Sequence, residues 1–108
     1  MTIDLPAPIQ LYFASEHSGD LSGMEGCFAA DAVVRDENRV FNGIDAIKAW
    51  RAEAAAKYDF TAEPVSAVVQ DDKVVVKARV TGNFPGSPVV LAHTFHIVGD
   101  RIASLEIG

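Results

Sequence analysis

Three side chains of types that can move a proton stand out in the chain: a carboxylate at Asp36, a phenol at Tyr12 and an imidazole at His93. Val34 and Asp36 fall on the same face of an expected strand, because side chains alternate along a strand. If Val34 points into the core, Asp36 also points inward, where a partly desolvated carboxylate can act as a general base. The alternative is a turn aspartate that bonds its own backbone in solvent.

His93 lies in a strand pattern in which Leu91, His93, Phe95 and Ile97 alternate, and three of these four are typical core residues. A histidine on such a face is either a hydrogen-bonded structural residue or an acid or base that works near neutral pH. His96 lies on the opposite face, which predicts a surface or dimer contact.

Tyr12 belongs to a stripe of apolar residues at helical spacing, together with Leu5, Ile9 and Phe13. Its ring is therefore expected in the core. A buried hydroxyl must find a partner, which is either a protein group or a ligand oxygen.

The elements that must position these residues can be read from periodicity and from breaker residues. The first helix carries the Tyr12 stripe and stops at Gly19-Asp20. The remaining pattern predicts, in order, a short helix from about Ser22 to Ala30, strands Ala32 to Asp36 and Val40 to Phe41, and an alanine-rich helix from Ile44 to about Tyr58.

After this helix the hydrophobic period changes to two, which is typical of strands. Pro64 marks a bulge or an edge position in the first of them, and two Gly and two Pro make a loop of Gly82 to Pro88. The predicted strands are Phe60 to Gln70, Lys73 to Phe84, Val89 to Val98 and Arg101 to Ile107. Helices followed by an antiparallel meander predict a single α+β domain over residues 1–108.

Several short motifs resemble the nuclear transport factor 2-like superfamily. Tyr12-Phe13, Gly19-Asp20-Leu21, Phe28-Ala29 and Asp31-Ala32-Val33 follow one another as in its steroid Δ-isomerases. Gly43-Ile44-Asp45-Ala46-Ile47 resembles the third helix start of SnoaL-like proteins, and His93-Thr94-Phe95 with Gly99-Asp100-Arg101-Ile102 resembles the closing hairpin. The resemblance implies a cone-shaped fold in which three helices from the N-terminal half pack on a strongly curved, mostly antiparallel sheet and enclose one pocket.

By this resemblance Asp36 falls on the general base of the isomerases, and Tyr12 on the phenol that stabilises the oxyanion. Their second oxyanion donor, a protonated aspartic acid, has no counterpart, because Val89 to Val98 contains no acid and the matching residue is Ala92 or His93. His93 is then a second donor or a proton shuttle. Scytalone dehydratases of the same superfamily use an aspartate, histidines and tyrosines, so the alternatives are a lyase that uses Asp36 and His93, or a ligand-binding or dimerisation module without chemistry.

The expected ligand is a small, largely apolar carbonyl compound, and the expected reaction needs no cofactor. Large apolar groups suit a pocket wall. The residues predicted to contact the ligand are Trp50, Phe41, Phe28, Phe95, Leu105 and Phe84. The histidines His17, His93 and His96 show no metal-site spacing, so no metal is expected. The resemblance also implies a homodimer through the outer sheet face.

The composition excludes several other functions. Fifteen Asp and Glu residues against nine Lys and Arg residues give a formal charge of −6, and no basic cluster offsets it, which argues against nucleic acid and anionic membranes as partners. The single cysteine, Cys27, allows no intrachain disulfide and reads as a buried structural thiol. No signal peptide or apolar span is evident, which predicts a cytoplasmic protein.

Overall fold

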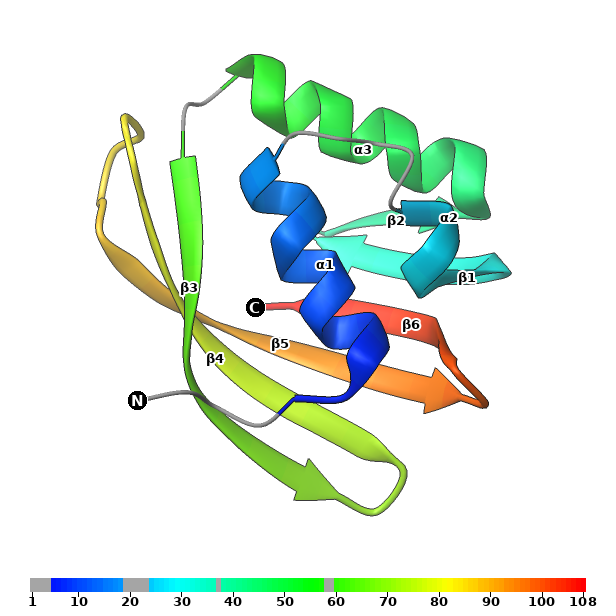
Figure 1. The fold of residues 1–108 in the computed structure, drawn as a ribbon. Coiled ribbons are helices and arrows are strands. Elements are labelled where there is room, and N and C mark those ends of the chain that lie inside the picture. Colours follow the sequence, from blue (N-terminus) through cyan, green and yellow to red (C-terminus); the bar gives the residue numbers. More distant parts are fainter. Residues whose placement is uncertain (1–4, 19–23, 37, 58–59) are drawn as a thin grey trace.

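The computed structural model describes residues 5–18, 24–36, 38–57 and 60–108, which form three helices and one six-stranded sheet (Figure 1). The elements are α1 (Ala7–Ser18), α2 (Met24–Cys27), β1 (Phe28–Asp36), β2 (Arg39–Asn42), α3 (Ile44–Lys57), β3 (Phe60–Gln70), β4 (Lys73–Gly82), β5 (Val89–Val98) and β6 (Arg101–Ile107). The strand order is β2-β1-β6-β5-β4-β3. Neighbours pair antiparallel except β1 and β6, which are parallel. The predicted α+β fold with a mostly antiparallel sheet is confirmed.

The sheet curves around the helices, so that one face is concave (Figure 1). Helix α1 lies across this concave face, and α3 packs on β1 and β2 at one end. The register between β3 and β4 shifts between Pro64 and Ser66, and such a bulge bends a strand. Pro64 thus occupies both a bulge and an edge strand, the two positions that the sequence allowed.

The core forms between α1 and the concave face. Along β4 every second side chain is buried, namely those of Val74, Val76, Ala78 and Val80, as the alternation predicts. The apolar stripe of α1, which includes Ile9 and Tyr12, packs against this face and is almost completely excluded from solvent.

The second helix is shorter than predicted. It covers only Met24–Cys27, and the chain is already a strand at Phe28, which pairs with Ile102 of β6. Alanines favour a helix locally, but sheet pairing overrides so weak a preference. Strand β4 ends at Gly82, two residues before Phe84. The predicted helix stop at Gly19-Asp20, the start at Ser22 and the end at Tyr58 lie outside the described residues.

Candidate functional site

A cavity of about 440 Å³ lies between α1, α3 and one end of the concave face. This volume is within the range of small-molecule sites. Much of its wall is apolar and comes from the sheet and from the loop after β4, including Phe41, Phe60, Val80, Phe84, Pro85, Val89, Leu91 and Ile107. The described charged residues of the wall are Asp36, Arg39, Arg51, Glu53 and Lys57.

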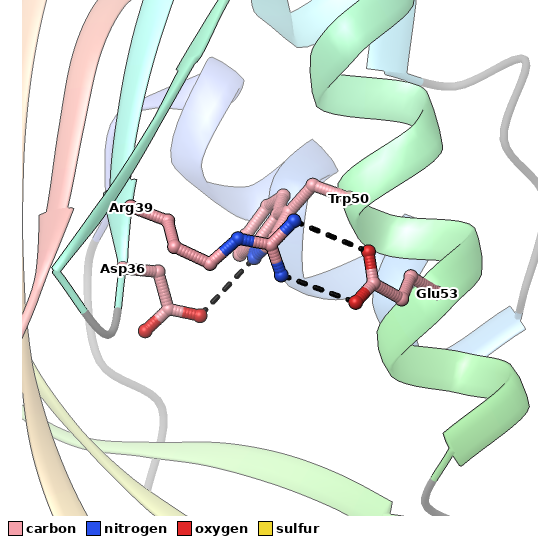
Figure 2. A network of polar contacts seen from close by, with 4 residues as sticks. All are labelled: Asp36, Arg39, Trp50 and Glu53. Carbon is pink, nitrogen blue, oxygen red and sulfur yellow. Dashed lines mark hydrogen bonds and ion pairs between the residues drawn. The ribbon is translucent and has the colours of Figure 1, made fainter.

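Asp36 is the last residue of β1 and is half-buried in the cavity wall. The indole Nε1 of Trp50 donates a hydrogen bond of 3.1 Å to its Oδ2 (Figure 2). Trp50 is itself buried in α3, so a rigid ring fixes the carboxylate. The second oxygen, Oδ1, accepts no hydrogen bond from the part of the chain that the structure describes, and it can therefore take a proton from a ligand.

At the mouth of the cavity, Arg39 of β2 and Glu53 of α3 form a bidentate ion pair (Figure 2). The distances are 3.1 Å from Nη1 to Oε1 and 3.5 Å from Nη2 to Oε2. The Arg39 guanidinium also lies 4.8 Å from the centre of the Phe41 ring. The hydrogen bond and the charge of Arg39 hold the pKa of Glu53 below its usual value. This pair ties the β1–β2 hairpin to α3 across the cavity.

Tyr12 and His93 lie deeper, where the cavity meets the core. The Tyr12 ring is 5.4 Å from the Phe95 ring and 6.2 Å from the His93 ring, both measured between centroids. His93 is 3% exposed, and its Nδ1 lies 3.1 Å from the carbonyl oxygen of Leu91. A carbonyl only accepts, so Nδ1 carries the hydrogen, and Nε2 of a neutral His93 is a proton acceptor.

The strand register gives the spacing between Asp36 and His93. Asp36 pairs with Ile107 of β6, and Ile107 pairs with His93 of β5, so the three residues form one row on one face. Strands are spaced about 4.8 Å apart, which separates the backbones of Asp36 and His93 by about 10 Å. Among the described residues Asp36 bonds Trp50, not His93. The two groups therefore lie two strands apart on the same face of the sheet, both in the wall of one cavity, and do not form a structural pair.

Arg51 is the residue of the cavity wall whose chemical importance the sequence analysis missed. It is only 5% exposed, and its Cζ lies 4.7 Å from the centre of the Tyr12 ring and 5.1 Å from that of the Trp50 ring. The available signal was an arginine on the inward side of α3, next to Ile47 and Trp50. A buried guanidinium needs compensation, and the two ring faces supply part of it.

The six predicted ligand contacts divide into two groups. Phe41, Trp50 and Phe84 line the cavity. Phe28, Phe95 and Leu105 are at most 2% exposed and belong to the hydrophobic core instead. Alternation along a strand shows that a side chain points inward, but it does not distinguish packed core from cavity wall, and Tyr12 lies over two of these residues, Phe28 and Phe95.

Cys27 is fully buried, and its Sγ lies 3.6 Å from the carbonyl oxygen of Met24. Burial raises the pKa of this thiol to about 11, although the positive charge of Arg51 acts in the opposite direction.

Within the described ranges, no three His, Cys, Asp or Glu side chains lie close enough together to hold a metal ion. None of the described helices has the length and apolar character needed to span a membrane.

A curved sheet that encloses helices and one cavity is the fold of the nuclear transport factor 2-like proteins. Within this class the chain belongs to the SnoaL-like domain family, which matches residues 9–105. No curated protein matches the chain significantly by sequence.

Solved structures support this assignment. A polyketide cyclase-like protein from Sinorhizobium meliloti is 42% identical over 97% of this chain and 96% of its own, with a TM-score of 0.94. A protein of ketosteroid isomerase-like fold from Catenulispora acidiphila, in complex with trimethylamine, is 20% identical over 97% and 86% of the two chains, with a TM-score of 0.84. An NTF2-like protein of unknown function from Cytophaga hutchinsonii is 10% identical over 99% and 93%, with a TM-score of 0.75. The last two show the fold.

Proposed function

We propose that the protein is an isomerase that moves a proton next to the carbonyl group of a small molecule, with Asp36 as the base. The observation that carries this proposal is the position of the carboxylate. It is half-buried in the wall of a cavity, one oxygen is held by the Trp50 indole, and the other is available to the ligand.

In the proposed reaction Asp36 removes a proton from the carbon next to the carbonyl. The electron pair of that C–H bond moves to the carbonyl oxygen and forms an enolate, which a hydrogen bond from the Tyr12 hydroxyl stabilises. Asp36 then returns the proton to a carbon further along, so that a double bond shifts and no atom is gained or lost. His93 lines the same cavity and contacts the ligand as a polar group in this proposal; it neither gains nor loses a proton, because Asp36 both removes the proton and returns it.

The first test uses cyclohex-3-enone, whose isomerisation to the conjugated cyclohex-2-enone is followed by ultraviolet absorbance. Asp36→Asn is expected to lower the rate by about 100- to 10,000-fold, the usual contribution of a general base. Asp31→Asn is the matched control, because Asp31 lies on the same strand but is exposed and outside the cavity wall. An unchanged rate in Asp36→Asn would falsify the assignment of the base.

The similarity to the polyketide cyclase-like protein favours a second candidate function. An aldol cyclisation begins with the same proton removal by Asp36, but the enolate carbon then attacks a second carbonyl of the same molecule. The electron pair of that C=O bond moves to its oxygen, which takes the proton back from Asp36 and becomes a hydroxyl. A linear diketone such as heptane-2,6-dione distinguishes the two, because a cyclase converts it into a cyclic β-hydroxy ketone and an isomerase leaves it unchanged. If the enzyme also removes water from this ketone to give a cyclohexenone, it acts as the lyase using Asp36 and His93 that the sequence allowed.

We also propose a homodimer through the outer face of the sheet. Val68 and Val90 point to this side and are 53% and 54% exposed, beside polar neighbours such as Arg79 and Thr94. Sedimentation equilibrium is expected to give a dimer, and Val90→Lys is expected to weaken it. A monomer at all protein concentrations would contradict this proposal.

A further inference from the structure

Arg51 differs from Arg39, another basic residue of the cavity wall, in how deeply it is buried. Arg39 of the same wall has a side chain that is 53% exposed and engages Glu53 at the mouth, whereas Arg51 as a residue is 5% exposed. Its guanidinium lies against the rings of Tyr12 and Trp50. Such flanking rings fix the plane of an arginine while its hydrogen-bond donors remain directed sideways.

The charge of the cavity differs from that of the whole chain. Its described wall contains three of the nine Lys and Arg residues but only two of the fifteen Asp and Glu residues. The described charges of the wall therefore sum to +1 (three minus two) in a chain whose formal charge is −6. The positive charge of this wall attracts an anionic group of a ligand locally, although the chain as a whole repels anions.

The base and the buried cation both contact the ring of Trp50, one at its edge and the other over its face. The Trp50 N–H holds Asp36, and the face of the same indole lies 5.1 Å from the Arg51 guanidinium. A ligand that reaches both groups carries its anionic group at one end and its acidic C–H bond at the other. A planar guanidinium suits a carboxylate, which it can bind with two parallel hydrogen bonds.

From these observations we propose that Arg51 binds a carboxylate of the ligand, so that the substrate class is a small enolisable carbonyl compound that carries a carboxylate, such as a keto acid. The proposal of a carboxylate subsite depends only on the burial of Arg51 and the charge of the cavity wall. The proposal that the ligand also has an enolisable carbonyl rests on the function proposed above. The subsite also gives the substrate one orientation, with its apolar body against Leu91 and Val89.

The test compares two ligands of nearly the same shape, cyclohexanecarboxylate and cyclohexanecarboxamide. Trp50 is the single tryptophan of the chain and lines the cavity, so its fluorescence reports binding, and calorimetry checks the affinities. Hydrogen bonds to charged groups contribute about 1.5–3 kcal/mol, which corresponds to about 10- to 100-fold tighter binding of the acid. Equal affinities for the two ligands, or no binding of either, overturn the proposal.

Two variants of Arg51 assign the preference to this side chain. Arg51→Met keeps most of the length but removes the charge, and it is expected to abolish the preference for the acid. Arg35→Met is the matched control, since Arg35 is exposed on β1 and lies outside the cavity wall, and it is expected to keep the preference. A preference that survives in Arg51→Met contradicts the proposal.

Arg51→Lys decides the question if the Met variant does not fold. It retains the charge but loses the planar fork, so the acid is expected to bind about three- to tenfold more weakly while binding of the amide is unchanged. The same loss for both ligands, or for neither, contradicts the proposal. These experiments need no turnover, so failure of Asp36 as a base leaves their outcome untouched, and failure of the subsite leaves the isomerase test untouched.

Discussion

The inner face of the sheet divides into a packed core and a cavity, and the border between them falls within single strands. On β1, Val34 is completely buried in the core, and Asp36, two residues further, lines the cavity. On β6 the same step leads from Leu105 in the core to Ile107 in the cavity wall. The backbone geometry is equivalent on both sides of the border.

The difference between the two regions comes from what covers the sheet. Over the core, the rings of Tyr12 and Phe13 on α1 pack against Phe95. His93 lies at the border, where its ring still contacts those of Tyr12 and Phe13. Beyond this cover an inward position of the sheet no longer needs to be apolar, and on β1 the Asp36 carboxylate occupies it, held by the Trp50 indole.

The largest effect is expected when the same Leu→Ala substitution is compared in the core and in the cavity wall. Leu105→Ala in the core is expected to lower the free energy of unfolding by about 3–5 kcal/mol, because it leaves a hole in close packing. Leu91→Ala in the cavity wall is expected to cost only about 1 kcal/mol, since Leu91 already borders empty space. Urea unfolding of both variants measures the difference, and equal losses would show that the cavity wall is packed like the core.

This division also explains how far the sequence could be read. The strands, the helix that carries Trp50 and the inward direction of Asp36 followed from periodicity, because each depends on local alternation. The cavity wall did not follow, because the step from Leu105 to Ile107 leaves the alternation pattern unchanged. Only the position of α1 over the sheet, a tertiary property, decides which inward residue lines a cavity.

Two features of the site depended on contacts between distant elements. The Trp50–Asp36 hydrogen bond joins residues of different elements, and no spacing rule predicts it. Arg51 lies on the same side of α3 as Ile47 and Trp50, and the sequence analysis assigned it no role. An arginine among alanines and large apolar residues on such a side was nevertheless a usable signal, because a buried charge needs a specific environment.

On the cavity side, the Trp50 hydrogen bond is expected to affect turnover more than folding. Trp50→Phe keeps an aromatic ring but removes the donor to Asp36, which is expected to lower kcat/KM by about 10- to 100-fold. In an Asp36→Asn background the same substitution is expected to cost much less, since the two residues act as one unit. Additive losses in this double-mutant cycle, measured with cyclohex-3-enone, would separate the two residues.

A smaller effect is expected at the mouth of the cavity. Arg39→Met removes the hydrogen bond and the charge that lower the pKa of Glu53, so this pKa should rise toward its ordinary value of 4.5. Because the folded-state pKa of Glu53 is depressed, the stability that it contributes is present above pH 4.5 and is lost as the pH falls through the folded value. NMR titration of the Glu53 side chain measures the shift, and added salt should reduce it in the unchanged protein.

The smallest effect near neutral pH is expected on the core side, at Cys27. Its folded-state pKa of about 11 lies above the ordinary 9.0, so the stability that it contributes is complete below pH 9 and is lost as the pH rises through 11. At pH 9 a thiol reagent is therefore expected to label Cys27 slowly in the native protein and quickly in urea. Rapid native labelling would show that the core opens at this point.

A single helix, α3, supplies the Trp50 donor, the Arg51 cation and the Glu53 partner of the mouth within four consecutive residues. None of these side chains takes part in the hydrogen-bonded ladders of the sheet. Sequence drift within one helical turn can therefore alter the charge, the size and the entrance of the cavity while the scaffold persists. This turn of α3 is therefore the place at which substitutions would change the selectivity of the cavity with the least effect on the sheet.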